Sequence, residues 1–321
     1  MVDWMREVRG LTEARARRLG KPVPLGLRIP PNLGFLKSIG IDVKALAGAG
    51  LVDFIGFSNF WQTTWDVPYD ELRAELGPEV MFYGVVEDAP NWIQGLAPSL
   101  ADRSPESFEG NLGNRLMAAS PEMQHANAAG KLAMGVHGIE QFNFFCTDQP
   151  RIPGLRCDYS ALKGTADLAY LRGRSKHYCL STPPQGRQGM APVTDLPEQV
   201  PAVLPPQWRK EFRLSMCAEP RDRNLQLTVQ VVIENRPNPP HLGVSFNGNW
   251  PVFKRAETRD LLFPTGPYTQ LTSKHLGLNY LLDASQIKEG WNTVLVHNTD
   301  KDSDGNAVTI VSLELGLKKS A

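Results

Sequence analysis

Four short apolar runs, separated by stretches with helical periodicity, organise the first half of the chain. They predict strands near 23–29, 52–58, 80–86 and 139–145. The second and third runs are almost continuously apolar, which is typical of strands buried on both faces of a parallel sheet. Because helical segments alternate with these strands, the pattern predicts four neighbouring parallel strands joined by right-handed crossovers, with helices on one outer face.

The helical segments carry recognisable start and stop signals. Residues 3–20 have apolar positions at helical spacing, and Gly20 and Pro22 predict the end of this helix. Ser120-Pro121-Glu122 combines an N-cap residue with a proline at the first helical position, so a helix is expected from there to about Met134. Residues 160–172 predict a closing helix.

The pattern changes after residue 180. Seven prolines between residues 181 and 206 predict an extended linker. Strand patterns then follow at 212–217, 225–233, 242–246, 291–297 and 307–317. Short strands joined by polar turns are typical of an antiparallel sandwich or jelly roll. The expected organisation is therefore an α/β unit at 1–180, a Pro-rich linker at 181–206 and a β-sandwich at 207–321.

Charge and known motifs exclude several functions. The 34 basic and 34 acidic residues balance, so we expect no nucleic-acid or membrane partner. No apolar stretch reaches the roughly 18 residues of a membrane-spanning helix. The chain has no GxGxxG, GxxxxGK[ST] or GxSxG motif, and its six histidines form no HxH or HExxH pair. We therefore expect no cofactor and no metal.

Two further patterns were weighed as metal or redox sites. The four cysteines at 146, 157, 179 and 217 form no CxxC pair, which favours free thiols, although one disulfide within 146–179 stays open. Residues 300–306 match the first half of a calcium loop, but Val311 stands where a glutamate ligand is needed. A polar hairpin between the last two strands is the preferred interpretation.

The strongest candidate for chemistry is Glu87, which directly follows the third predicted strand. If the four strands are strands five to eight of a (β/α)8 barrel, Glu87 lies at the C-terminal mouth of strand seven, where barrel enzymes keep their active sites. Glu87 would then be a nucleophile or base. The alternative is a solvent-facing glutamate, or one paired with Arg28.

Other polar and aromatic residues at the ends of the predicted strands complete the candidate site. They are Arg28, Asn59, Trp61, Trp65, Trp92 and Asn143. An arginine and two amides can hydrogen-bond sugar hydroxyls, and indole rings stack on the apolar face of a pyranose. The alternatives are a structural salt bridge for the arginine and a capping role for the tryptophans.

The order of several motifs resembles a known family. The chain is similar to bacterial glycoside hydrolases of the family-10-like TIM-barrel type in the order of four motifs. These are Leu27-Arg28-Ile29-Pro30, Gly50-Leu51-Val52-Asp53, Gly138-Ile139-Glu140-Gln141-Phe142 and the predicted helix ending Ser175-Lys176-His177-Tyr178. Val244-Ser245-Phe246-Asn247-Gly248 resembles the galactose-binding-like sandwich appended to such barrels. The resemblance implies half a TIM barrel, strands five to eight, followed by a jelly-roll sandwich.

This resemblance implies glycosidic-bond hydrolysis, incomplete in this chain. Many barrel glycosidases place the general acid after strand four, and the resemblance begins after that strand. The expected ligand is a carbohydrate, and self-association through open barrel edges is expected. Without a second carboxylate, the isolated chain should hydrolyse aryl glycosides negligibly. The alternatives are a non-catalytic carbohydrate-binding protein and a truncated gene fragment.

Overall fold

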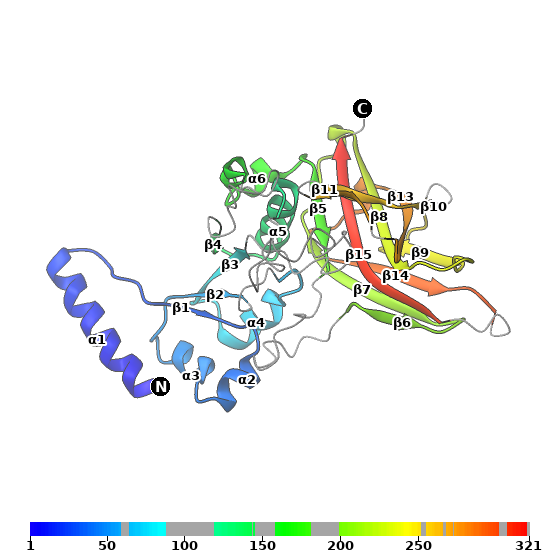
Figure 1. Cartoon of the computed structure of the whole chain (residues 1–321). Helices are drawn as coiled ribbons and strands as arrows, with labels where there is room; N and C mark the ends of the chain where they lie inside the picture. Colours follow the sequence, from blue (N-terminus) through cyan, green and yellow to red (C-terminus); the bar gives the residue numbers. More distant parts are fainter. Residues whose placement is uncertain are drawn as a thin grey trace, which may run out of the picture.

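The computed structural model describes residues 1–58, 64–87, 119–142, 144, 158–180, 199–251, 255–265, 268–271, 273–301 and 307–319. These residues form a mixed α/β structure with several sheets and no closed barrel among them. Figure 1 shows the α/β part, which holds the described residues up to 171, beside a part made of antiparallel sheets, residues 176–319. We call the second the two-sheet part.

The α/β part is built on four parallel strands that adjoin one another in chain order. They are β1 (Gly26–Ile29), β2 (Phe54–Phe57), β3 (Met81–Glu87) and β4 (Gly138–Phe142). Each neighbouring pair is parallel, with Leu27 opposite Ile55 and Ile55 opposite Phe82. The predicted strand order and direction are confirmed, and β1 and β2 are shorter than the apolar runs that predicted them.

Helices cover one face of this sheet. The structure has α1 (Val2–Leu19), α2 (Leu33–Ser38), α3 (Val43–Gly48), α4 (Tyr69–Leu76), α5 (Pro121–Ala133) and α6 (Leu168–Leu171). Leu36 of α2, Val43 of α3 and Leu72 of α4 share one buried apolar cluster with Ile55 and Phe82 of the sheet. Burial of these apolar side chains, at about 25 cal/mol per Å², holds the helices on the strands.

The predicted helix ends agree with the caps observed. Gly20 ends α1 in the left-handed conformation, with φ at 67°. The Ser120 side chain accepts a hydrogen bond from the Met123 amide at the start of α5. The closing helix predicted over 160–172 is wrong, because the chain forms η5 (Tyr159–Leu162) and the single turn α6. Gly164, at φ 72°, separates them.

The two-sheet part contains two antiparallel sheets and a hairpin. The larger sheet has the order β10 (Ala256–Thr258), β13 (His275–Asp283), β8 (Leu225–Glu234), β15 (Val308–Lys319) and β5 (Lys176–Cys179), with β6 (Ala202–Leu204) also on β15. The smaller has β7 (Arg209–Met216), β14 (Gly290–Asn298) and β9 (Leu242–Phe246), and the hairpin pairs β11 (Asp260–Thr265) with β12 (Tyr268–Gln270). Two further helical turns are η6 (Arg221–Arg223) and η7 (Ala284–Gln286).

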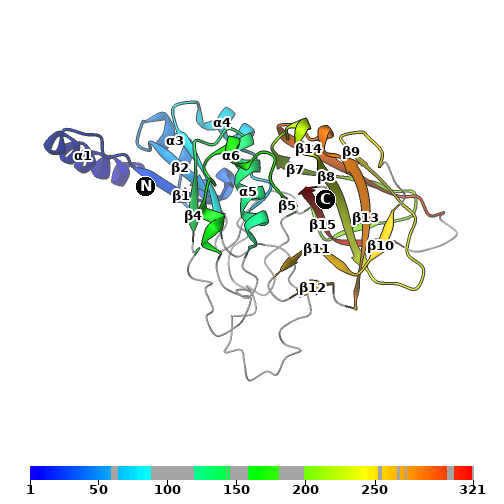
Figure 2. The ribbon, with the colours of Figure 1, turned by 90° about the horizontal axis from the view of Figure 1, so that it is seen from above.

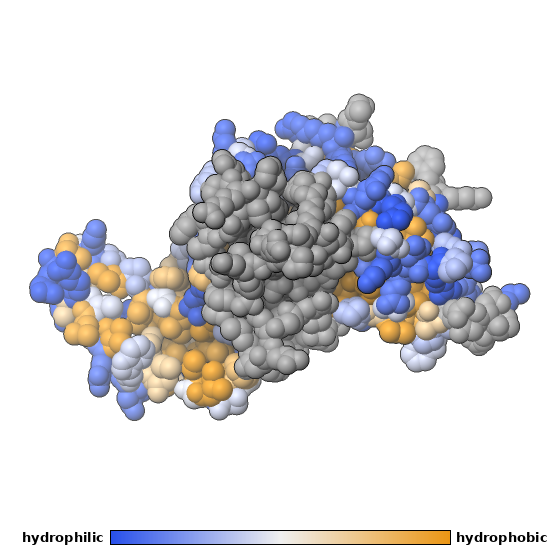
Figure 3. All heavy atoms as spheres, in the orientation of Figure 1, coloured by the Kyte–Doolittle hydropathy of each residue, from blue (hydrophilic) through white to orange (hydrophobic). Residues whose placement is uncertain are grey.

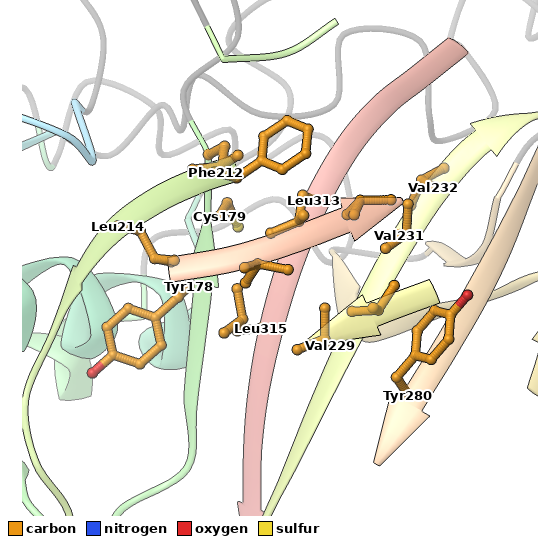
Figure 4. Close-up of a cluster of buried hydrophobic side chains, with 14 of the residues drawn as sticks. Tyr178, Cys179, Phe212, Leu214, Val229, Val231, Val232, Tyr280, Leu313 and Leu315 are labelled. Atoms are coloured by element: carbon orange, nitrogen blue, oxygen red, sulfur yellow. The ribbon is translucent and has the colours of Figure 1, made fainter. Parts of the chain in front are cut away.

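Apolar side chains from both sheets meet in one core. Phe212 and Leu214 of the smaller sheet lie near Leu313 and Leu315 of the larger one (Figure 4). Along β14, buried and half-buried positions alternate strictly, as expected of a strand with one face on a core.

Several predictions for this region are corrected. Ser175-Lys176-His177-Tyr178 does not end a helix, because β5 is a strand whose four residues are all buried. The stretch between the last two strands is not a hairpin, because β14 and β15 belong to different sheets. The strand β13 was missed, since Gly277 and Asn279 interrupt its apolar pattern. The division at 181–206 stays a prediction, with β6 inside the predicted linker.

The two parts are in direct contact through polar side chains. The Trp291 indole N–H donates to the Asp70 carboxylate at 3.0 Å, and the Gln199 amide donates to the Asp66 carboxylate at 3.2 Å. In the view from above, α5 lies between the parallel sheet and β5 (Figure 2). The α/β part and the two-sheet part therefore form a continuous structure.

Gly130 sets how closely α5 approaches β7. A Cβ at this position would lie 2.4 Å from the Ser215 carbonyl oxygen. Gly130→Ala should therefore lower the free energy of unfolding by roughly 2–3 kcal/mol, because the helix must move off the strand. The control is Gly10→Ala in α1, which meets nothing within 4 Å and should stabilise the chain by about 0.5–1 kcal/mol. Urea denaturation measures both, and an equal effect of the two changes would contradict the close contact.

Apolar side chains also gather on the surface over α1, α2 and α3 (Figure 3). Trp4 and Leu11 of α1 are largely exposed, and Met5 is its buried residue. Among the described residues, no helix is both long and apolar enough to cross a membrane.

Candidate functional site

The face of the parallel sheet turned away from the helices carries the candidate site. Leu27, Ile55 and Phe82 point into the helix-covered core, and successive strand residues alternate between faces. The opposite face therefore carries the alternate residues, which are Arg28, Phe54, Gly56, Tyr83, Val85, Glu140 and Phe142. This set contains both a cation and a carboxylate.

Arg28 and Glu140 form an ion pair across this face. The Arg28 Nε lies 3.5 Å from the Glu140 Oε1, and the two side chains are 26% and 37% exposed. The Arg28 guanidinium carbon also lies 3.3 Å from the centre of the Phe142 ring, in cation–π contact. The aromatic ring therefore helps to fix the pair in place, and both side chains stay partly exposed, although the Nε and Nη2 atoms of Arg28 are buried.

Gly56 makes this pair possible. Arg28 is on β1 and Glu140 on β4, so their side chains meet above β2 and β3. A Cβ at Gly56 would lie 2.7 Å from the Glu140 Oε2 and 3.1 Å from a Val85 methyl group. The absence of a side chain at Gly56 thus leaves the space in which the Glu140 carboxylate reaches Arg28.

Aromatic rings cover the N-terminal end of the same face. Phe54 and Tyr83 pack edge to face, with ring centres 5.4 Å apart. Gly26 and Gly138 lie under these rings, since a Cβ would be 2.1 Å from the Phe54 ring at the first and 2.9 Å from the Tyr83 ring at the second. The two glycines let the rings lie down on the sheet, where they form an apolar floor beside the ion pair.

The predicted site residues are only partly within the described structure. Glu87 is the last residue of β3, and its backbone is opposite Phe142 of β4. The Glu87 side chain and all of Asn59, Trp61, Trp92 and Asn143 lie outside the described residues. Their proposed roles stay predictions, as does the question of the cysteines at 146 and 157.

Two predicted residues can be placed fully. Arg28 lies on the face of the sheet turned away from the helices, where it forms an ion pair with Glu140. Trp65 is only 4% exposed and belongs to the large hydrophobic core of the two-sheet part. Its carbonyl accepts a hydrogen bond from the Ser215 hydroxyl at 3.4 Å. Trp65 thus fixes the contact between the two parts of the molecule.

Glu140 is the residue that the sequence reasoning missed. The strand Gly138–Phe142 carries Ile139 toward the helices, so alternation alone assigns Glu140 to the opposite face. A glutamate in the middle of a predicted sheet strand is unusual enough to be a signal, because charged side chains are rarely placed there without a partner. Glu140 is therefore a carboxylate on the same face as Arg28 that the predicted site does not include.

Lys131 is a second missed group, on the helix side of the sheet. This fully buried α5 residue donates through Nζ to the Val85 carbonyl and to the Asn127 side-chain oxygen, each at 2.5 Å. Burial lowers its pKa to about 7, and the negative charge of Asp66 opposes the shift. Lys131 therefore holds the helix-facing side of β3, the strand that ends in Glu87.

Comparisons with known proteins give little likeness. No protein-family model matches the chain, and no curated protein matches it. A solved structure that does match is a β-porphyranase of glycoside hydrolase family 86 from the human gut bacterium Bacteroides plebeius. The identity is 14% over 36% of this chain and 18% of that chain, with a TM-score of 0.23. At that score the likeness supports neither a shared fold nor a shared chemistry, and the family-10 resemblance stays a prediction.

Proposed function

We propose that the face of the parallel sheet turned away from the helices is part of a glycoside-hydrolase site, with Glu140 and Glu87 as its two carboxylates. The observation that carries the proposal is the partly exposed Arg28–Glu140 pair, in which the Arg28 guanidinium lies over the Phe142 ring. Sugar-cleaving sites need carboxyl groups for acid, base or nucleophile roles, and aromatic faces for the apolar side of the ring. The face combines both kinds of group with an arginine that can donate to hydroxyls.

The strand register gives the two carboxylates a workable separation. Glu87 is opposite Phe142, and Glu140 is two residues earlier on the same neighbouring strand. With strands about 4.8 Å apart and a rise of about 3.3 Å per residue, the two Cα atoms are about 8 Å apart. Glutamate side chains starting from that separation can reach the spacing of about 5–5.5 Å of retaining enzymes or of about 6.5–9.5 Å of inverting ones.

The same proposal includes the finer architecture. The parallel sheet would be strands five to eight of a TIM barrel, and the two antiparallel sheets a jelly-roll, galactose-binding-like sandwich. The open edges of the sheet support self-association, since β1 and β4 each have one strand neighbour among the described residues. A paired edge would extend the sheet toward the barrel that the proposed hydrolysis requires.

The test is to incubate the full chain with a panel of aryl glycosides and to measure release of the phenol. The predicted site has a single carboxylate and on that ground predicts little hydrolysis. The proposed role of Glu140 supplies a second carboxylate and so changes that expectation. We now expect measurable release from at least one glycoside by the associated form, which size-exclusion chromatography with light scattering identifies. Absence of release in all oligomeric forms would leave only the binding function below.

A second candidate is carbohydrate binding by the two-sheet part, favoured by two exposed tryptophans. Trp208 and Trp250 are 66% and 63% exposed, although large aromatic side chains are usually well buried. Trp250 lies over β9, with its ring 3.6 Å from where a Gly243 Cβ would be. Trp208 adjoins β14, since its backbone carbonyl accepts a hydrogen bond from the Asn298 amide.

Removing these rings should weaken binding without unfolding the chain. Trp250→Ala and Trp208→Ala are each expected to weaken retention in polysaccharide-containing gels by roughly 2–12-fold, because a stacking aromatic ring is worth about 0.5–1.5 kcal/mol. Trp291→Ala is the matched control, since its indole is bonded to Asp70 at the junction. Retention that is equal in wild type and both variants would exclude this surface.

A further inference from the structure

Three side chains of metal-ligand type are buried together between β5 and β15. His177 and Cys179 are two residues apart on β5, so they share a face of the sheet, and Glu314 of β15 is directly opposite Cys179. This is the face opposite to that of Tyr178 and Leu315. All three side chains have no exposed surface.

The ligand atoms of this cluster are already close together. The His177 Nε2 lies 2.7 Å from the Glu314 Oε2, and the nitrogen, sulfur and carboxylate oxygen all lie within 4.8 Å of one another. The other carboxylate oxygen of Glu314 accepts from the Ser312 hydroxyl at 3.4 Å. Such a second hydrogen bond orients a carboxylate that binds a metal. Shifts of about 1 Å would bring the three atoms to coordination distances from a common centre.

We propose that His177, Cys179 and Glu314 bind one divalent transition metal ion, with Zn²⁺ as the best chemical match. Nitrogen, thiolate sulfur and carboxylate oxygen are the three ligand types that zinc takes in proteins. A neutral imidazole, a thiolate and a carboxylate together carry two negative charges, so a divalent cation makes the buried cluster neutral. That balance removes the cost of burying an isolated charge, which is several kcal/mol in a protein interior.

The surroundings enclose the cluster. The Phe263 ring of β11 stacks on the His177 ring, with centres 4.9 Å apart and planes 23° apart. Gly316, opposite His177, lets this hairpin approach, because a Cβ there would lie 2.8 Å from the Leu262 side chain. The metal would therefore be enclosed by this hairpin and slow to exchange. It would join β5 to a strand 137 residues later in the sequence.

The experiment is to refold the full chain with Zn²⁺ or Co²⁺, remove unbound metal, and measure metal content and the visible spectrum. We expect about one metal per chain and, with Co²⁺, a thiolate-to-cobalt charge-transfer band. Cys179→Ser should lose the band, and Glu314→Gln should lose most of the metal. Cys217→Ser is the matched control, because Cys217 is also a buried free thiol of this part and should leave both readouts unchanged.

The outcomes separate a site from adventitious binding. Wild-type chain that refolds without bound zinc, or a charge-transfer band that persists in Cys179→Ser, would overturn the proposal. If the variants fail to fold, the wild-type metal content and spectrum decide alone, and a chelator present during refolding should then lower the melting temperature. A melting temperature unaffected by the chelator would equally overturn it. None of these readouts depends on sugar hydrolysis.

Discussion

Lys131→Met is expected to make the chain more stable at pH 6 to 7 and to remove much of the rise in stability between about pH 7 and 10. Burial holds the pKa of Lys131 at about 7, against 10.5 in a solvated chain. Between these values the unfolded chain binds a proton that the folded chain does not, so the free energy of unfolding rises with pH. The slope is about 1.4 kcal/mol per pH unit, and the whole shift corresponds to roughly 3–5 kcal/mol.

Below pH 7 the penalty for burying the charged amine is fully present, so the methionine variant gains most there. Urea denaturation of both proteins at several pH values measures the difference, in which other titrating groups cancel. Lys44→Met is the control, because Lys44 is an exposed residue paired with Glu75 and its replacement removes no buried amine. Parallel curves for wild type and Lys131→Met would show that the amine is not held neutral.

Neutralising either proposed carboxylate is expected to reduce turnover of a responsive aryl glycoside by about 10²–10⁴-fold. Glu140→Gln and Glu87→Gln keep side-chain volume, but an amide can serve neither as a nucleophile nor as an acid or base. Both variants should unfold at urea concentrations close to that of wild type, since Glu140 is partly exposed. The control is Glu79→Gln, a change at an exposed turn before β3.

The two variants also separate the roles of the carboxylates. If Glu87 is the nucleophile, azide should restore turnover in its variant by attacking in place of the carboxylate. If Glu140 is the general acid, its variant should retain activity on substrates whose leaving group needs no protonation. Full activity in the Glu140 variant would remove Glu140 from the mechanism and leave it as a structural partner of Arg28.

The parallel sheet could be predicted from the sequence because its signals are local. Apolar runs separated by capped helices determine strand order with few alternatives, and Ser120 and Gly20 marked helix ends correctly. Glu140 was not recognised as part of the site, because its pairing with Arg28 depends on the space above Gly56, which a larger residue would fill. A glycine in a strand indicates that another group approaches the backbone closely, but it does not identify that group.

The two-sheet part was harder to predict for a different reason. Strands that pair in this part are far apart in the sequence. Residues 176–179 form the strand β5 because they hydrogen-bond to the edge of β15. Nothing near His177 in the sequence indicates Glu314, so a ligand set of this kind is visible only after folding. Trp65 shows the same effect, since its burial depends on strands that begin more than a hundred residues later.

The position of β15 has a consequence for synthesis of the chain. β5, β6 and β8 all pair with this strand, yet all three leave the ribosome before it does. Until residues 308–319 emerge, the strand edges that pair with β15 have no native hydrogen-bonding partner in the growing chain. β8 can pair with β13 before β15 emerges, but β5 and β6 can join the larger sheet only afterwards, so a chaperone would have most to protect at these two strands.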